Sequence, residues 1–328
     1  MSLPAYCLLA ALAAFLLCVF CLSLLIPRLR VAKMGQKILE IGPAWHAPKE
    51  GTPTMGGLAF LLTLLPLGAL LYLFALREYT ALTLYPFAVA LIYTVASGAI
   101  GIVDDLTKFR HARNEGLTPT QKLILQSVLS AAYLALLRLS GLLDTTLYIP
   151  LWKEYYDLGI FTYLLLLFIQ VGITNCANLT DGIDGLAASV GALIFAFYML
   201  LSCIVGEIAP LLQSALLLGC ALAFLLFNRH PARIFMGDTG SLLLGAGAAA
   251  IPLMLKQPLI ILLVGAVYIL EGVSVILQVV FYKLTHRRLF LMAPIHHHFE
   301  KRGWSENRIV FCFSAITLLA CLLAAFLL

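Results

Sequence analysis

The protein has 328 residues, of which 62% are hydrophobic and only 11% are charged, and its mean hydropathy is +1.01. A soluble domain of this length needs much less apolar surface, so the composition excludes a soluble protein and predicts a polytopic membrane protein. The formal net charge of +5 becomes informative only when the basic residues are assigned to loops.

Apolar runs of roughly 17 to 25 residues can cross the hydrocarbon core of a bilayer as helices. The chain contains ten candidate helices: Leu3–Ile26, Gly57–Leu76, Leu82–Val103, Lys122–Leu139, Gly159–Thr174, Gly185–Val205, Leu211–Phe227, Ser241–Leu255, Leu259–Tyr282 and Arg308–Leu328. The first run has no basic residue before it and is longer than the apolar core of a signal peptide, so we expect a retained helix. We therefore predict an all-α fold with about ten transmembrane helices in a single domain covering residues 1–328.

The loops between these runs differ in charge. One set of alternate loops carries all but four of the 21 lysines and arginines, and the other set carries only Arg77, Arg138, Lys153 and Lys256. Because basic residues concentrate in cytoplasmic loops, the first set is predicted to be cytoplasmic and both termini external. The polar, motif-like stretches also fall in the first set, which predicts an active site on the cytoplasmic face.

Two adjacent acids, Asp104 and Asp105, follow the third apolar run and are themselves followed by basic residues. At the C-terminal end of a helix, two neighbouring carboxylates are disfavoured by the helix dipole and by mutual repulsion. We therefore expect a metal ion or basic side chains to hold them, whereas the alternative is an acidic, solvated loop. Asp238 is a third acid on the same predicted side, unless it only caps the eighth helix. Three acids are enough for magnesium, which takes one or two carboxylates and completes its shell with phosphates and water.

Further candidate groups occur at the starts of predicted helices. Lys49 and Thr54 lie in a stretch rich in glycine and threonine, where backbone amides and a lysine can bind an anion. The alternative there is an ordinary helix start capped by Thr54. Lys122 opens the fourth helix, either near the acids or as an interfacial lysine. Phe235 could stack on a planar base.

The stretch NLTDGIDG contains three polar groups, Asn178, Asp181 and Asp184, just before the sixth predicted helix. Capping alone would need one such group. Asp181 and Asp184 are three residues apart and would face one way on a helical turn. We expect a polar pocket here that binds the hydrogen-bonding edge of a ligand.

Three consecutive histidines, His296, His297 and His298, lie between basic residues in the last predicted cytoplasmic loop. Their side chains point in different directions, which disfavours a zinc site, whereas histidines among basic residues suit a polyanion such as pyrophosphate. Glu271 lies within the ninth apolar run. An ionisable group at membrane depth is costly, so Glu271 either has a function or pairs within the bundle.

Five stretches occur in the order GTPTMGG, DDLTK, NLTDGIDGLA, NRHPARIFMGDTGS and MAPIHHHFEKRGWSE, and they span residues 51–306. On these stretches the chain closely resembles the bacterial phospho-N-acetylmuramoyl-pentapeptide transferases, within the polyprenyl-phosphate N-acetylhexosamine-1-phosphate transferase superfamily. The HHHFE tract favours this branch over its N-acetylglucosamine-1-phosphate sibling. The segment after Glu306 reads NRIVFCFSAI, where the family leads us to expect a more basic and aromatic helix start; no catalytic motif is affected.

The resemblance implies a magnesium-dependent phosphosugar transferase in the bacterial inner membrane, with its active site facing the cytoplasm. Its substrates would be UDP-N-acetylmuramoyl-pentapeptide and undecaprenyl phosphate, and its products lipid I and UMP, in the first membrane step of peptidoglycan synthesis. Nucleoside inhibitors would compete with the uridine substrate. The resemblance allows a homodimer, and no nucleic-acid partner is expected.

The resemblance also implies a role for each candidate residue. Asp238 would be the main magnesium ligand with Asp105 beside it, and Asp104 would be the base that keeps the lipid phosphate ionised. Lys122 and His296 would interact with the negative charge of the phosphates. The remaining candidates would bind the substrate, mainly at its uridine end: Lys49, Thr54, Asn178, Asp181, Asp184, Phe235, His297 and His298.

Two other classes of protein are compatible with parts of the sequence. A sibling enzyme would use UDP-N-acetylglucosamine with the same metal chemistry. A lipid flippase or transporter would also have a basic inner face and a buried Glu271. However, it would not need three acids and an NLTDGIDG loop on one side, and it would release no UMP.

Overall fold

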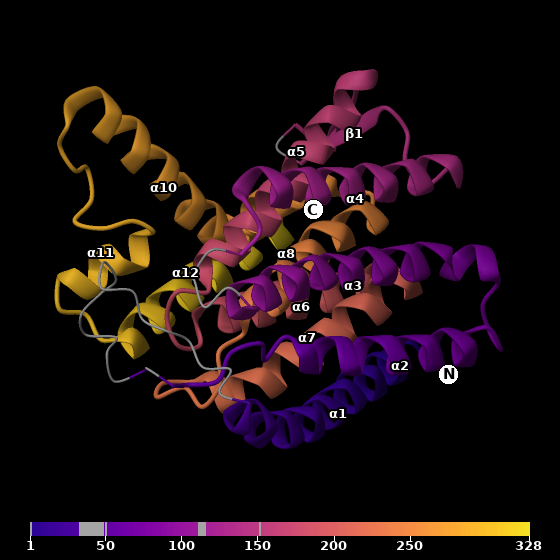
Figure 1. The fold of residues 1–328 in the computed structure, drawn as a ribbon. Coiled ribbons are helices and arrows are strands. Elements are labelled where there is room, and N and C mark those ends of the chain that lie inside the picture. Colours follow the sequence, from indigo (N-terminus) through magenta and orange to yellow (C-terminus); the bar gives the residue numbers. More distant parts are fainter. Residues whose placement is uncertain (1, 33–48, 50, 111–115, 151) are drawn as a thin grey trace.

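The computed structural model of the chain describes residues 2–32, 49, 51–110, 116–150 and 152–328 (Figure 1). The side chain of Arg110, and residues 111–115 with Arg113, lie outside this description. The described elements are α1 (Leu3–Val31), α2 (Leu58–Ala75), α3 (Ala81–Arg110), α4 (Pro119–Leu139), β1 (Thr146–Ile149), β2 (Glu154–Asp157), α5 (Ile160–Thr180), α6 (Leu186–Val205), α7 (Ile208–Asn228), α8 (Gly237–Met254), η2 (Pro258–Ile260), α9 (Ile261–Val264), α10 (Ala266–Thr285), α11 (Ile295–Lys301) and α12 (Glu306–Leu327).

The predicted all-α, polytopic membrane architecture is confirmed. Among the described residues, nine helices are long and apolar enough to cross a membrane: α1 to α7, α10 and α12. The eighth predicted helix, Ser241–Leu255, corresponds to α8, which is not one of these nine. In α8 every residue from Thr239 to Leu253 is buried, and the helix packs against α3, α5 and α7. This central helix therefore faces protein on all sides rather than lipid.

Small residues bring the membrane helices close together. On α1 the buried face includes Ala10 and Ala14, while Leu12 and Leu16 on the opposite face are at least half exposed. Gly219 of α7 packs against the backbone of α1, where an added Cβ would lie 2.7 Å from the Ala14 side chain. Small residues inside and large apolar residues outside are typical of helices that pack within a bilayer.

Several helix ends differ from the prediction, and the differences bear on the site. The third helix runs seven residues past Val103 to Arg110, so the acid pair lies within its last turns rather than beyond its end. The fifth helix runs to Thr180 and includes Asn178. The eighth helix begins at Gly237, which places Asp238 in its first turn. Apolar composition misses these ends because the terminal turns of the helices are polar and still helical.

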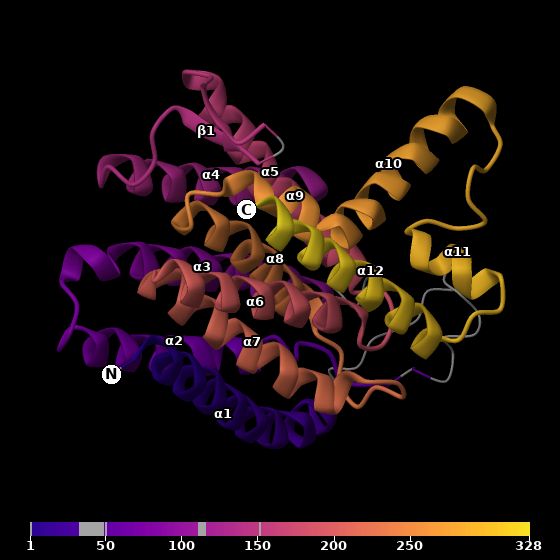
Figure 2. The same cartoon turned by 180° about the vertical axis from the view of Figure 1, so that it is seen from behind.

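The prediction of one unbroken ninth helix was wrong. The chain forms the short η2 and α9 and then turns at Gly265, whose backbone leaves the helical conformation, before α10 begins. Both views show α10 diverging from the other helices toward α11 (Figures 1 and 2). The long outer loop also holds an antiparallel pair of strands, β1 and β2, in which Leu147 pairs with Tyr156. These strands are short and were not apparent from alternation in the sequence.

Candidate active site

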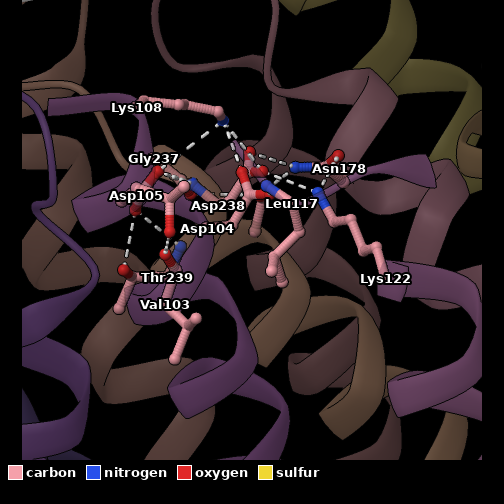
Figure 3. A network of polar contacts seen from close by, with 12 residues as sticks. Val103, Asp104, Asp105, Lys108, Leu117, Lys122, Asn178, Gly237, Asp238 and Thr239 are labelled. Carbon is pink, nitrogen blue, oxygen red and sulfur yellow. Dashed lines mark hydrogen bonds and ion pairs between the residues drawn. The ribbon is translucent and has the colours of Figure 1, made fainter. Parts of the chain in front are cut away.

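Three carboxylates converge where the end of α3 meets the start of α8 (Figure 3). Asp104 and Asp105 come from α3, and Asp238 comes from α8. One carboxylate oxygen from each of the three acids lies within 4.8 Å of the other two. The close approach of the helices depends on Gly101 of α3, because a Cβ there would overlap the backbone of Asp238. The structure thus brings these three acids of the predicted site together.

Lys108 bridges all three acids. Its Nζ lies 2.7 Å from Asp104, 3.9 Å from Asp105 and 3.0 Å from Asp238. Since α3 continues past Val103, Lys108 lies one turn after Asp104 on the same face. The sequence predicted that a metal ion or the basic side chains after the acid pair would hold the acids, and Lys108 is such a side chain. The signal that could have assigned it is the four-residue spacing from Asp104.

Asp105 fixes the start of α8. Its carboxylate accepts hydrogen bonds from the backbone N–H groups of Asp238 at 3.1 Å and Thr239 at 3.0 Å, and from the Thr239 hydroxyl at 2.7 Å. These N–H groups are among those that a helix leaves unpaired at its N-terminus, where a negative charge is favourable. Asp105 therefore sets the position of Asp238 as well as adding its own charge.

Asp238 joins the acid cluster to two other helices. Lys122 of α4 places its Nζ 2.6 Å from Asp238 Oδ2. Asn178 of α5 donates from Nδ2 to Asp238 Oδ1 at 2.9 Å and to the Ser241 hydroxyl at 2.7 Å. Asn178, which the sequence assigned to the uridine end, thus lies at the acid cluster.

Asp104 has a different environment from its neighbour. Its Oδ1 accepts a hydrogen bond from the Leu117 N–H at 2.9 Å, and its Oδ2 faces Lys108. Only 2% of the residue is exposed. The segment before α4 packs over this carboxylate, because a Cβ on Gly116 would lie 2.7 Å from Asp104 Oδ1.

The donor set fits a hard divalent cation. Carboxylate oxygens this close together suit magnesium, which takes one or two carboxylates and completes its shell with phosphates and water. The two ammonium groups leave one negative charge uncompensated when all five groups are ionised. Asp238 and Asp105, the two ligands that the family resemblance implies, belong to this group of acids that could hold a metal ion. Thr54 is near this edge of the site, since a Cβ on Gly237 would lie 3.2 Å from its hydroxyl.

A second polar cluster surrounds Asp184. Its carboxylate is 2.7 Å from Lys49 Nζ and 2.8 Å from His230 Nδ1, and it accepts a hydrogen bond from the Ala232 N–H at 3.0 Å. Glu306 at the start of α12 lies 2.7 Å from the same Lys49 Nζ. Lys49 and Asp184 were predicted site residues. His230, which follows α7, and Glu306, which begins α12, were not singled out, although both lie in the motif stretches of the sequence.

Buried Asn228 holds the loops around this cluster. It accepts a hydrogen bond from the Gly185 N–H at 2.9 Å and donates to the Ile234 carbonyl at 2.9 Å. Phe235 is fixed by its backbone, which donates to Pro53 and accepts from Gly56, each at 2.8 Å, and its ring is half-buried. Asn228 was not singled out because it directly follows the seventh predicted apolar run and looked like an ordinary first residue of a loop.

Asp181 lies between the two clusters. It forms the C-cap of α5 and remains partly accessible. Desolvation, followed by the charges of Asp238, Asp105 and Asp184, raises its pKa well above the usual range of an aspartate. A protonated or cation-bound Asp181 is therefore favoured beside the other acids.

The histidines on α11 point in different directions, as predicted. His296 is completely buried, 3.0 Å from the equally buried Glu271 of α10, and its ring packs against Gly182. His297 pairs with Glu300. His298 Nδ1 accepts the Leu291 N–H at 3.1 Å; partial burial and then the charge of Arg302 lower its pKa. Glu271 thus pairs within the bundle, which was one of its two predicted alternatives.

Comparison with known proteins places this site in a family. The model of glycosyl transferase family 4 matches residues 87–256, and the phospho-N-acetylmuramoyl-pentapeptide-transferase signature 1 matches residues 49–61. A phospho-N-acetylmuramoyl-pentapeptide-transferase of Clostridium perfringens is 43% identical over 92% of this chain and 90% of its own length. Relatives with the same name come from Halalkalibacterium halodurans, at 41% identity over 98% and 97%, and Caldicellulosiruptor bescii, at 40% over 96% and 95%.

The chain belongs to the phospho-N-acetylmuramoyl-pentapeptide-transferase family. It is therefore a phosphosugar transferase of the membrane, and the resemblance drawn from its motifs is confirmed. The first signature covers Lys49 and Thr54, and the glycosyl transferase match includes the three acids, Lys122, Asn178 and Asp184.

Proposed function

We propose that this protein transfers phospho-N-acetylmuramoyl-pentapeptide from the UDP-linked donor to undecaprenyl phosphate at the cytoplasmic face of the bacterial inner membrane, releasing UMP and forming lipid I. The observation that carries the proposal is the cluster of Asp104, Asp105 and Asp238 with two lysines at one end of an apolar bundle. A lipid phosphate and a soluble nucleotide sugar can meet only at such an end. Positive and negative groups together suit a reaction between anions that requires a cation.

The two polar clusters support a division of labour along the donor. The acid cluster, with Lys108 and Lys122, is proposed to bind the pyrophosphate. The cluster around Asp184 is proposed to bind the uracil, because a carboxylate beside an ammonium complements a ring that presents an N–H beside a carbonyl. Phe235 is proposed to stack on that ring, and Asp181 to lie between the two ends.

Magnesium is proposed as the cofactor, held by Asp238 and Asp105; when bound, it would neutralise the pyrophosphate oxygens. The chain supplies the remaining steps. Asp104 accepts the proton of the lipid phosphate and keeps that phosphate ionised for attack on the sugar-linked phosphorus. Lys108 and Lys122 stabilise the charge that develops on the departing UMP. Asn178 holds the Asp238 carboxylate in one orientation.

The histidines of α11 are proposed to interact with the substrate. His297 and His298 are partly accessible and are proposed as substrate contacts. His296 is also proposed as a catalytic group that interacts with the charge of the phosphates. Because Glu271 and Gly182 now enclose it, a direct contact would require a shift of α11.

The test is UMP release by the purified protein in detergent. UDP-N-acetylmuramoyl-pentapeptide should release UMP only when undecaprenyl phosphate and magnesium are both present. UDP-N-acetylglucosamine, supplied at the same concentration, should release none. Turnover of the glucosamine donor alone would assign the chain to the sibling activity, and release of no UMP from either donor would reject the proposal.

A further inference from the structure

The Glu306 carboxylate contacts residues outside its own helix. It is the first residue of α12, whose N-cap is Ser305. The Glu306 Oε2 accepts hydrogen bonds from Lys49 Nζ at 2.7 Å and from the Asp184 N–H at 2.8 Å. Its Oε1 lies 3.5 Å from His230 Nδ1. One carboxylate thus contacts three segments that are far apart in the chain.

Capping of α12 does not account for this arrangement. The Ser305 hydroxyl accepts the Arg308 N–H and serves as the cap. An acid in a capping box stands three residues after the cap, whereas Glu306 follows it directly. Its side chain is 10% exposed and turned toward the Asp184 loop, so its charge is directed at that loop.

The charges of the cluster indicate a lysine-centred site. Ligand atoms of Asp184, His230 and Glu306 lie within 4.8 Å of one another, which is a spacing that could suit a metal ion. However, Lys49 Nζ is 2.7 Å from both carboxylates. An ammonium group therefore already lies between the two acids and offsets one of their two negative charges. Lys49 keeps a counter-ion when either acid turns to another donor.

We propose that Glu306 is a positioning residue for the nucleotide-binding end, acting through Lys49 and the Asp184 backbone; this rests on the proposed function. When a base N–H engages the Asp184 carboxylate, the bond from Lys49 to Asp184 is given up. Glu306 then retains Lys49 in place beside the base. Its bond to the Asp184 N–H fixes the loop, so that the carboxylate need not be reoriented on binding.

The experiment compares Glu306→Gln with the matched control Glu207→Gln, which changes an exposed acid at the N-cap of α7. Glu306→Gln should raise the dissociation constant of UMP and the KM for the muramoyl donor by about tenfold, the order expected for loss of one charge-assisted hydrogen bond. The kcat should stay within about threefold, because the acid cluster is unchanged. Glu306→Asp, one methylene shorter, should give an intermediate KM.

A double-mutant cycle with Lys49→Met separates positioning from general stability. If Glu306 acts through Lys49, adding Glu306→Gln to Lys49→Met should raise KM by less than about threefold. A fully additive rise would overturn the proposal, as would wild-type UMP affinity in Glu306→Gln. If Glu306→Gln fails to fold, Glu306→Asp carries the test, and a wild-type KM there would reject the role. Failure of the proposed function is distinct, since the wild-type protein would then release no UMP.

Discussion

At the scale of single residues, the three acids share one site but have different surroundings. Asp105 is committed to the N–H groups of α8, and Asp238 is held by Asn178 and Lys122. Asp104 has one backbone donor and Lys108. It is therefore the acid whose carboxylate is least fixed by the fold, which agrees with a role in proton transfer.

Replacement of Asp104 by Asn should abolish turnover while leaving binding intact. The asparagine keeps the shape and the acceptor for the Leu117 N–H, but it is no base. We expect kcat to fall by at least about 100-fold, in the range usual for loss of a general base, with UMP affinity within about threefold of wild type. UMP release and UMP titration on the same folded preparation measure both. Near-normal turnover would reduce Asp104 to a counter-ion of Lys108.

Replacement of Lys108 by Met should increase the affinity for magnesium. Its ammonium lies within 4 Å of all three carboxylates and so competes with a divalent cation for their charge. We expect the magnesium concentration for half-maximal thermal stabilisation to fall by about tenfold, while turnover falls. Lys283→Met, which removes an exposed lysine near the end of α10, is the control. An unchanged or higher magnesium requirement would contradict this account.

At the scale of elements, the site depends on how closely α3 approaches α8. Gly101 meets the carbonyl of Asp238, and Gly57 before α2 meets Gly240 of α8 in the same way. These contacts are backbone on backbone, so no side chain can yield. The glycines therefore set the distance between the acid pair and the third acid.

Gly101→Ala should lower both stability and activity. The added methyl would push α3 from the start of α8, and overpacking of this kind costs about 1–3 kcal/mol. Gly172→Ala in α5 is a matched control, because nothing lies within 4 Å of its Cβ position. Thermal unfolding in detergent should show a lower melting temperature for Gly101→Ala alone, together with weaker UMP release. Equal behaviour of the two variants would show that the contact is not limiting.

The sequence predicted the helices better than their ends. Apolar runs gave the membrane helices because hydropathy reports what lies in lipid. It did not report that α3 stays helical through Lys108, since that turn is polar. It also gave no sign that Gly265 would break the ninth run, because glycine is frequent within membrane helices. The site geometry depends on the polar turns that hydropathy leaves out.

The candidate site could be predicted as a set of residues but not as two clusters. The acids, Lys122 and Asn178 meet at one point, whereas Lys49 and Asp184 meet His230 and Glu306 elsewhere. Such partners are separated by many residues along the chain. Glu306 reaches them through the packing of α12, mainly against α6 and α9, and one sequence does not specify that packing.

At the scale of the whole molecule, the polar clusters and α11 occupy one end of the bundle, and the N-terminus lies at the other (Figures 1 and 2). This arrangement agrees with the distribution of basic residues among the loops. That distribution predicts that the end of the bundle with α11 faces the cytoplasm. Lys301 belongs to α11, and Lys153 lies between β1 and β2, which both views place away from α11 (Figures 1 and 2). These two positions therefore test the orientation of the protein in the membrane.

Single cysteines at positions 301 and 153 should be labelled from opposite sides. In intact cells, a membrane-impermeant maleimide should modify Lys153→Cys and leave Lys301→Cys unmodified until the membrane is opened. The unsubstituted chain, with its eight free cysteines, gives the background. Lys301 ends α11 and Lys153 lies in the turn between β1 and β2. Neither is a proposed site residue, so both variants should retain UMP release and prove folded. Labelling of position 301 from outside would invert the topology and place the proposed site on the wrong face for a cytoplasmic nucleotide sugar.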